Sequence, residues 1–399
     1  MAIVYDAPSN TITVTEGTAV APNTFQDIKD ANDAGVWGVV AQTENCFTFG
    51  CHLSIGDDET ETHFADTNKL VQFTAGVTTG NSQYCIRLYD YVTFTLGAVV
   101  NADDKTTGDG CTILSKDITY EYVRLVSFVS LYTHSTVNLY SCNIISLGAG
   151  ASYALFRRIN AGNIWNCMFH NVIWEDCHNL DVFHVHLTDY HFGSGISYCS
   201  GTFDQLWVTA GYSYIYFYSD VTSDFVNLYG RGYIGWYNIR CYSITTDKTI
   251  TNGDLNIWDF NWAGTSTAKV YRKYQFDLEA MDIDGVAIED ATVKIWDTND
   301  NLVTDTTTDG DGKIAQQTLT YGYYDEAGGN TPTLETPHKL QISKSGYETY
   351  YGLMTADKQL SFEIILKNSI KVNLLDDEPI IKLHPESYVD KERRKFIEV

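Results

Sequence analysis

Four carboxylates in the middle of the chain could act as acid, base or nucleophile on a sugar bond. They are Glu175, Asp176, Asp189 and Asp204. A glycosidase needs two carboxyl groups about 5–10 Å apart, one to protonate the leaving oxygen and one to activate water or attack the sugar. Because the chain holds 51 Asp and Glu residues, some pairs reach that separation by chance. We therefore predict no catalytic residue and keep these four as the alternative.

Two histidines, His184 and His186, are separated by a single residue. On a strand, residues two apart point to the same face, so both imidazoles could bind a metal with Asp189 or His191 as a third ligand. Histidines on an exposed polar face give the same pattern. We predict no metal and no cofactor, and keep a metal site at His184 and His186 as the alternative.

The balance of charges limits the partners that these side chains could meet. The chain has 26 Lys and Arg residues against 51 Asp and Glu residues, a formal net charge of −25. This charge repels acidic polysaccharides and phosphate backbones, so we predict no nucleic-acid partner. Basic residues that would hold an acidic sugar are also scarce near the carboxylates. Between residues 125 and 265 the arginines are Arg157, Arg158, Arg231 and Arg240.

The elements that must position these residues are short apolar-aromatic runs separated by Gly, Asn, Asp or Ser. Four runs open with an Asn followed by an aliphatic residue and an aromatic ring, starting at Asn138, Asn163, Asn227 and Asn256. Short strands that recur every 20 to 30 residues or so are typical of stacked β architectures. We therefore predict a right-handed parallel β-helix, in which strands of successive coils pair in parallel.

The aliphatic and aromatic residues of these four runs are predicted to fill the core. We expect the side chains of Ile164, Trp165 and Leu228 to point inward. The Asn that opens each run either bonds to the neighbouring coil or is an ordinary turn former, and both alternatives stay open. The cysteines in or beside the runs are predicted to be buried free thiols, because a small thiol packs like a small apolar group.

The strongest helix signal lies near the N-terminus. Thr24 can cap a helix, and Asp27 three residues later suits the positive end of the helix dipole. Phe25, Ile28 and Ala31 form one apolar stripe. A stacked β core must be covered at its open end, so we predict that this helix is the cap.

No window of the sequence is apolar enough to span a membrane. The first residues also lack the basic and apolar regions of a signal peptide. We therefore expect a protein that is made in the cytoplasm and has no membrane span.

A different pattern of strands and turns begins near Tyr274. It contains, in order, D-x-x-G at Asp282–Gly285, A-x-V-x-I at 291–295, T-D-x-x-G at Thr308–Gly312 and K-x-G-Y at Lys344–Tyr347. The order resembles the carboxypeptidase regulatory-like (transthyretin-like) β-sandwich. That resemblance implies a small Ig-like sandwich, usually non-catalytic, that serves as a spacer or adhesion module.

Two Asp-rich stretches of this region, Asp297–Asn301 and Asp309–Gly312, could be cation loops. The first lacks the Gly and the Glu that a calcium loop needs at its sixth and twelfth positions. We predict both stretches as turns and keep a cation at the second as an alternative. The insertion Tyr321–Pro337 is longer than a hairpin of such a sandwich requires.

We predict four segments along the chain. Residues 1–40 form an N-terminal strand and capping helix, 41–268 the parallel β-helix, 269–368 the β-sandwich and 369–399 a tail. The tail holds a basic run, Lys391–Lys395, in an otherwise acidic chain. It is either a solvated terminus or an arm that docks on a neighbouring subunit.

A β-helix without an export signal, followed by a sandwich and a tail, resembles the virion-borne β-helix proteins of tailed viruses, such as tailspikes, fibres and capsid decorations. The resemblance implies a viral structural protein on the virion surface, made in the host cytoplasm. Such a protein contacts other virion proteins, forms a homo-oligomer and adheres to a host surface glycan or protein. We predict this non-catalytic role. The alternatives are a polysaccharide-cleaving tailspike, acting as a glycoside hydrolase or lyase, and an adhesin secreted by another route.

Overall fold

Strands are by far the main secondary structure of the residues that the structure describes, which confirms the predicted all-β class. A computed structural model gives the structure, and the only α-helix among the residues it describes is α1 (Phe25–Ala34). No helix in this described part is long and apolar enough to cross a membrane. The described residues are 2–44, 46–57, 59–74, 86–116, 127–130, 135–147, 154–170, 172–188, 195–197, 199–209, 214–218, 223–230, 239–255 and 258–369.

The structure divides into two compact units. The first contains Met1–Tyr271 and Tyr324–Pro332, and the second contains Arg272–Tyr323 and Thr333–Val399. Each unit has its own hydrophobic core. The middle of the predicted insertion therefore belongs to the first unit, and Tyr324 is part of that unit's core.

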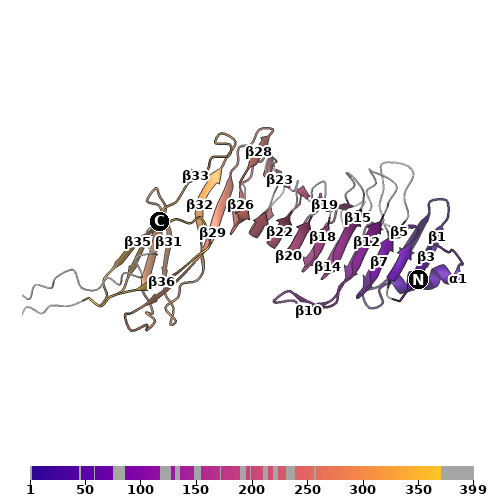
Figure 1. Cartoon of the computed structure of the whole chain (residues 1–399), viewed down its shortest axis with the longest axis horizontal. Helices are drawn as coiled ribbons and strands as arrows, with labels where there is room; N and C mark the ends of the chain where they lie inside the picture. Colours follow the sequence, from indigo (N-terminus) through magenta and orange to yellow (C-terminus); the bar gives the residue numbers. More distant parts are fainter. Residues whose placement is uncertain are drawn as a thin grey trace, which may run out of the picture. The chain divides into compact units, whose positions relative to one another are not determined.

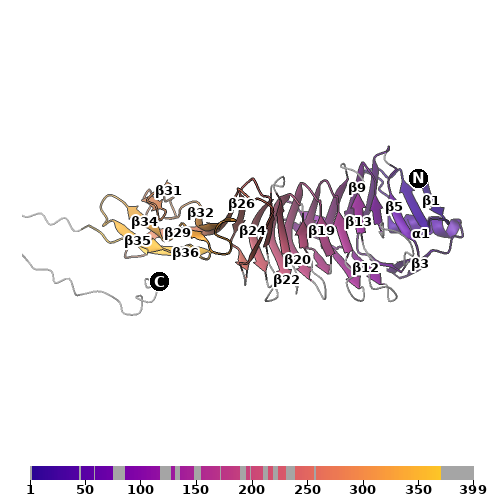
Figure 2. The ribbon, with the colours of Figure 1, turned by 90° about the horizontal axis from the view of Figure 1, so that it is seen from above.

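Two sheets made mostly of parallel strands form the first unit, and strands of one sheet lie side by side along it (Figure 1, Figure 2). Sheet A consists of β1 (Ala2–Asp6), β2 (Thr11–Thr15), β5 (His52–Ile55), β8 (Ile86–Leu88), β13 (Ser127–Ser130), β16 (Ala154–Arg157), β19 (Val172–Glu175), β21 (Gly195–Ser197), β23 (Tyr214–Tyr218), β25 (Ile239–Tyr242) and β28 (Phe260–Ala263).

In the first unit, sheet B consists of β3 (Val40–Thr43), β4 (Cys46–Phe49), β6 (Thr62–Asp66), β7 (Leu70–Phe73), β9 (Val92–Leu96), β12 (Thr112–Lys116), β14 (Thr136–Tyr140), β15 (Asn143–Leu147), β17 (Gly162–Trp165), β18 (Met168–His170), β20 (Leu180–Thr188), β22 (Gly201–Thr209), β24 (Ser223–Gly230), β26 (Lys248–Thr251) and β27 (Asp254–Leu255). A separate antiparallel hairpin joins β10 (Val99–Asn101) and β11 (Thr106–Thr107).

Equivalent strands of successive coils pair in parallel, where a coil is the stretch of chain that visits each sheet once. Ile164 on β17, for example, pairs with Leu139 on β14 and with Val182 on β20. All three side chains are fully buried. Because side chains alternate between the two faces of a strand, in-register pairing sends the same position of every coil inward.

The core of the first unit lies between sheets A and B. Rings from the two sheets meet there: Phe169 of sheet B lies 5.9 Å from Phe156 and 4.9 Å from Trp174, both of sheet A. Phe217 and Phe225 make the same kind of contact at 5.7 Å. Edge-to-face and tilted ring pairs of this kind add to the stabilisation that burial gives.

Cysteines line this core as buried free thiols, as predicted. Burial raises the pKa of the Cys51 and Cys241 thiols to about 12, so they stay protonated at neutral pH. A protonated, enclosed thiol is a poor nucleophile. Cys51 and Cys241 therefore serve packing. The buried cysteines are Cys51, Cys111, Cys142, Cys167, Cys177, Cys199 and Cys241.

Helix α1 covers the core beside the first coils, as predicted. Phe25 contacts the rings of Phe47, Phe49 and Phe64 at centroid distances of 6.1, 6.0 and 4.9 Å. At the start of the helix, Thr24 caps the backbone and forms a capping box with the residue three positions later. The local signals in the sequence therefore locate this element correctly.

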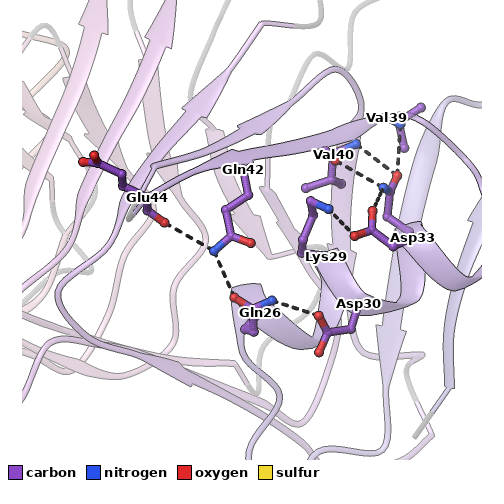
Figure 3. A network of polar contacts seen from close by, with 9 residues as sticks. Gln26, Lys29, Asp30, Asp33, Val39, Val40, Gln42 and Glu44 are labelled. Carbon is purple, nitrogen blue, oxygen red and sulfur yellow. Dashed lines mark hydrogen bonds and ion pairs between the residues drawn. The ribbon is translucent and has the colours of Figure 1, made fainter.

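The third buried position of α1 is Asn32 rather than the predicted Ala31, which is only half-buried. The Oδ1 atom of Asn32 accepts hydrogen bonds from the backbone N–H groups of Val39 and Val40, both at 3.0 Å. Its Nδ2 atom donates to the Val40 carbonyl at 3.2 Å. The surrounding polar network ties the helix to the chain that enters β3 (Figure 3).

The second unit holds β29 (Val270–Met281, whose first two residues belong to the first unit), β30 (Thr292–Trp296), β31 (Leu302–Thr307), β32 (Gln317–Tyr324, whose last residue belongs to the first unit), β33 (Thr333–Leu334), β34 (His338–Ser343), β35 (Tyr350–Met354) and β36 (Leu360–Ile365). Strands β31, β30, β34 and β35 form an antiparallel sheet in that order. Strand β36 pairs in parallel with β29.

Three turns of the second unit share one hydrogen-bond pattern. In each, the Oδ1 atom of an Asp accepts bonds from the backbone N–H groups two and four residues later; the three are Asp282, Asp297 and Asp309. The residue three positions after each Asp has a positive φ. Both Asp-rich stretches are therefore turns, as predicted, and side-chain bonds to the backbone hold them.

Candidate functional site

The outward face of sheet B carries a column of stacked rings. His186, Trp207 and Tyr229 occupy equivalent positions on β20, β22 and β24. The His186 and Trp207 rings are 4.5 Å apart and 3° from parallel; the Trp207 and Tyr229 rings are 4.9 Å apart and 14° from parallel. Paired strands lie about 4.8 Å apart, so in-register rings stack face to face. Where the rings stack, their edges rather than their faces border the solvent.

A corner with left-handed backbone runs beside this column. His184, Gln205 and Asn227 have φ values of 51°, 53° and 51° at successive coils. Few residues other than Gly adopt this conformation, and Asn tolerates it best. Their side chains connect the coils: His184 Nδ1 lies 3.1 Å from Gln205 Oε1. Asn227 donates to Asp204 Oδ1 at 2.8 Å and accepts from Asn252 at 3.0 Å.

The four runs that open with an Asn do not all have the same position relative to this corner. Asn138 and Asn163 precede it, and the backbone N–H of Asn163 donates to Asn138 Oδ1 at 3.1 Å. Asn227 lies at the corner itself, while Asn256 lies outside the described residues. Of the two alternatives left open for these residues, the structure supports bonds between neighbouring coils for the described members. The runs are not one equivalent repeat.

On the other side of the corner, the β10–β11 hairpin lies against sheet B (Figure 1). The Lys105 ammonium is 2.7 Å from Asp181 Oδ1 and lies over the rings of Trp165 and Phe183, 5.6 and 5.2 Å from their centroids. The Lys105 carbonyl accepts a bond from Asn166 Nδ2 at 3.0 Å. This hairpin covers a second aromatic cluster.

Trp165 is buried, but the prediction that it points inward is wrong. It follows the inward-facing Ile164 and so belongs to the outer face of β17. Its Nε1 atom donates to Asp181 Oδ2 at 3.1 Å, and the Lys105 hairpin covers the ring, which is only 6 % exposed. The predictions for Ile164 and Leu228 are confirmed, since both are fully buried in the core.

The carboxylates of the catalytic alternative fall on two different sheets. Glu175 ends β19 of sheet A and Asp176 follows it, whereas Asp204 lies on β22 of sheet B. Asp176 faces Arg158 Nε at 3.6 Å and His178 Nε2 at 3.2 Å. Strand pairing therefore does not bring Asp204 onto the face of Glu175 and Asp176. The fourth member, Asp189, lies outside the described residues.

His184 and His186 do lie together, with ring centroids 5.5 Å apart. Burial lowers the pKa of His186, and the neighbouring His184 lowers it further. Both rings also have other partners, because His186 stacks on Trp207 and His184 contacts Gln205. Within the described part of the chain, no group of three or more His, Cys, Asp or Glu residues could hold a metal ion.

Sequence reasoning missed Lys105 as a member of this surface. Lys105 and Asp181 are 76 residues apart in the chain, and no local pattern connects them. Asp181 is one of 51 acidic residues, and nothing in the sequence indicates its bonds to Lys105, Trp165 and Thr202. Only the stacking of coils brings these groups together.

The sequence matches no protein-family model and no curated protein. Several solved structures are weakly similar, and three of them illustrate the level of similarity. A tailspike protein 2 enzymatically active domain from bacteriophage CBA120 matches 79 % of this chain and 69 % of its own length, at 10 % identity and a TM-score of 0.20. The 3-chlorocatechol 1,2-dioxygenase of Rhodococcus opacus 1CP matches 24 % of this chain and 60 % of its own length, at 14 % identity and a TM-score of 0.19. The TIE protein of Bacillus anthracis matches 27 % of this chain and 19 % of its own length, at 13 % identity and a TM-score of 0.20. Scores this low establish neither a shared fold nor a shared activity.

Proposed function

We propose that this chain is a non-catalytic display and adhesion protein on the surface of a virus particle. In this proposal, the first unit is a right-handed parallel β-helix and the second a transthyretin-like β-sandwich. The observation that carries the proposal is the outward face of β20, β22 and β24. It consists of rings stacked on one another and polar side chains bonded from coil to coil. A rigid surface of this kind suits binding.

The state of the carboxylates also supports binding over bond cleavage. Asp204 accepts a bond from Asn227, and Asp176 faces Arg158 and His178. A glycosidase pair must lie about 5–10 Å apart across one sugar, with one group free to transfer a proton. Glu175 and Asp176 belong to the sheet A side of the coil and Asp204 to sheet B.

We propose a neutral glycan as the receptor of this face. The net charge of −25 repels acidic polymers. Ring edges and the polar groups of His184 and Gln205 can donate and accept hydrogen bonds from sugar hydroxyls. Each contact is weak, and several copies on one particle would strengthen attachment through avidity.

Binding is tested with immobilised neutral and acidic polysaccharides from bacterial capsules and cell walls. We expect the full chain to bind a neutral member, and Trp207→Ala to weaken that binding at least about tenfold, or 1.4 kcal/mol. Tyr242→Ala is the matched control, because this 46 % exposed ring ends a strand of sheet A. Equal losses in the two variants would place the contact elsewhere.

The same incubations test for cleavage. New reducing ends, abolished by Glu175→Gln or Asp204→Asn, would overturn the non-catalytic role and favour the tailspike enzyme. Localisation is tested separately by labelling intact particles with antibodies against the purified chain. We expect label on the particle surface. Particles that carry no label would contradict the role on the virion but would not affect the result on glycan binding.

A further inference from the structure

The second unit leaves the edge of β35 without a strand partner among the described residues. This strand ends its sheet and pairs there with β34 alone. Tyr351 and Leu353 project from one face of β35 and are 72 % and 71 % exposed. An open strand edge with apolar side chains is a template for another strand.

The C-terminal tail begins close to this edge. The backbone N–H of Ser369 donates to the Gly346 carbonyl at 2.8 Å, and Asn368 bridges Tyr347 in antiparallel fashion. Gly346 and Tyr347 lie in the connection that leads from β34 into β35. The last described residues of the chain are therefore anchored beside the start of the open strand.

The sequence after Ser369 has the pattern of a half-buried strand. Ile370, Val372 and Leu374 alternate with Lys371 and Asn373. Period-two alternation of this kind predicts a strand with one apolar face. Five residues also match the length of β35, and Asp376, Asp377, Glu378 and Pro379 end the pattern.

The anchor of the tail decides which copy it can pair with. Asn368 runs antiparallel to Tyr347, so the chain continues toward Gly346 and away from the start of β35. To pair with its own β35, the tail would have to reverse direction, and the tightest common hairpin needs two loop residues. The apolar alternation starts at Ile370, directly after the anchored Ser369, and leaves no residues for that turn.

We propose that residues 370–374 of one copy add a strand to the β35 edge of a neighbouring copy. The backbone groups of the edge then gain partners, and Ile370, Val372 and Leu374 cover Tyr351 and Leu353 as cross-strand neighbours. The chain is thus a homo-oligomer held by its tails. This inference does not depend on the proposed function of the first unit.

The first test compares the masses of the full chain and of a chain that ends at Ser369, by analytical ultracentrifugation up to about 100 μM, where contacts with micromolar Kd are populated. We expect the full chain to be oligomeric, the shortened chain to be monomeric, and both to have the same melting temperature. A monomeric full chain, or a shortened chain that forms the same oligomer as the full chain, would overturn the proposal.

A pair of substitutions tests the edge itself. Leu353→Lys places a charge on the open strand and is expected to give monomers. Val303→Lys is the matched control, because Val303 is 48 % exposed on β31, the opposite edge strand of the same sheet. This variant should keep the mass of the full chain. Dissociation by both substitutions, or by neither, would rule out the β35 edge.

Cross-linking tests whether the pairing joins two copies. A chain that ends at Ser369 and carries Leu353→Cys is mixed with a full-length chain that carries Val372→Cys, under mild oxidation. Neither chain holds both new thiols, so a disulfide between Cys at these two positions forms only between copies. We expect the mixed dimer, and Val303→Cys in place of Leu353→Cys should not give it. Equal yields from the two positions would contradict the proposal.

Discussion

Asn32 shows how one side chain joins two elements of the N-terminal cap. It is buried, and its amide bonds two backbone N–H groups and one carbonyl of the segment that enters β3. Asn32→Leu keeps the volume similar but leaves buried backbone groups without partners, at about 1–3 kcal/mol for each. We therefore expect a lower free energy of unfolding in urea melts.

Gln26→Ala is the control for that substitution. Gln26 belongs to the same polar network, but its side chain bonds Asp30 and Gln42 in an exposed position (Figure 3). Its loss should change the free energy of unfolding by less than about 0.5 kcal/mol. An Asn32→Leu protein as stable as Gln26→Ala would show that water replaces the lost bonds.

His338 predicts a dependence of stability on pH. Burial lowers the pKa of its imidazole below the usual 6.5, and the nearby Asp297 offsets only part of that shift. As the pH falls, the unfolded chain takes up this proton before the folded chain does, so folding stability is full above about 6.5 and declines as the pH falls through the lowered folded pKa. His338→Leu should remove this contribution. Between pH 7.5 and 5, the melting temperature of the wild-type protein should fall more than that of the variant, and parallel curves would contradict the assignment.

Substitution of Lys105 tests how the β10–β11 hairpin is attached to sheet B. The Lys105–Asp181 pair is partly exposed, so Lys105→Ala should cost less than about 1 kcal/mol of stability. The hairpin should nevertheless open more often, because Lys105 also covers the Trp165 and Phe183 rings. Amide hydrogen exchange of residues 99–107 should accelerate, and quenching of Trp165 fluorescence should increase.

Lys294→Ala supplies the comparison, because Lys294 forms an ion pair of similar exposure with Asp305 in the second unit. It should leave exchange in residues 99–107 unchanged. A large loss of stability in Lys105→Ala without faster exchange would mean that the hairpin is part of the folding core.

How far the sequence predicts an element depends on the range of its contacts. The helix after Thr24 was predictable because its cap and apolar stripe lie within ten residues. The apolar-aromatic runs predicted strands such as β17 and β24, but they could not distinguish a buried inward ring from a buried outward one. Trp165 is of the second kind because the Lys105 hairpin, distant in sequence, covers it. Likewise, no local signal marks Tyr324 as core, although its ring lies 4.3 Å from Phe260.

At the scale of the whole molecule, the net charge of −25 opposes compaction. Salt screens exposed charges, with a Debye length of about 10 Å at 0.1 M and about 3 Å at 1 M. We expect the melting temperature to rise from low salt to about 0.5 M sodium chloride. A melting temperature that falls or stays the same as sodium chloride is added would show that local ion pairs outweigh the overall repulsion.

The spacing between paired residues of successive coils varies while their alignment does not. Side-chain bonds join equivalent positions that are 43 residues apart at Thr95 and Asn138, 31 at Thr112 and Asn143, 18 at His170 and Thr188, and 25 at Asn227 and Asn252. The excess residues lie in the connections. Evolution can therefore lengthen, shorten or exchange the connection of one coil while the strand pairing of the neighbouring coils is kept.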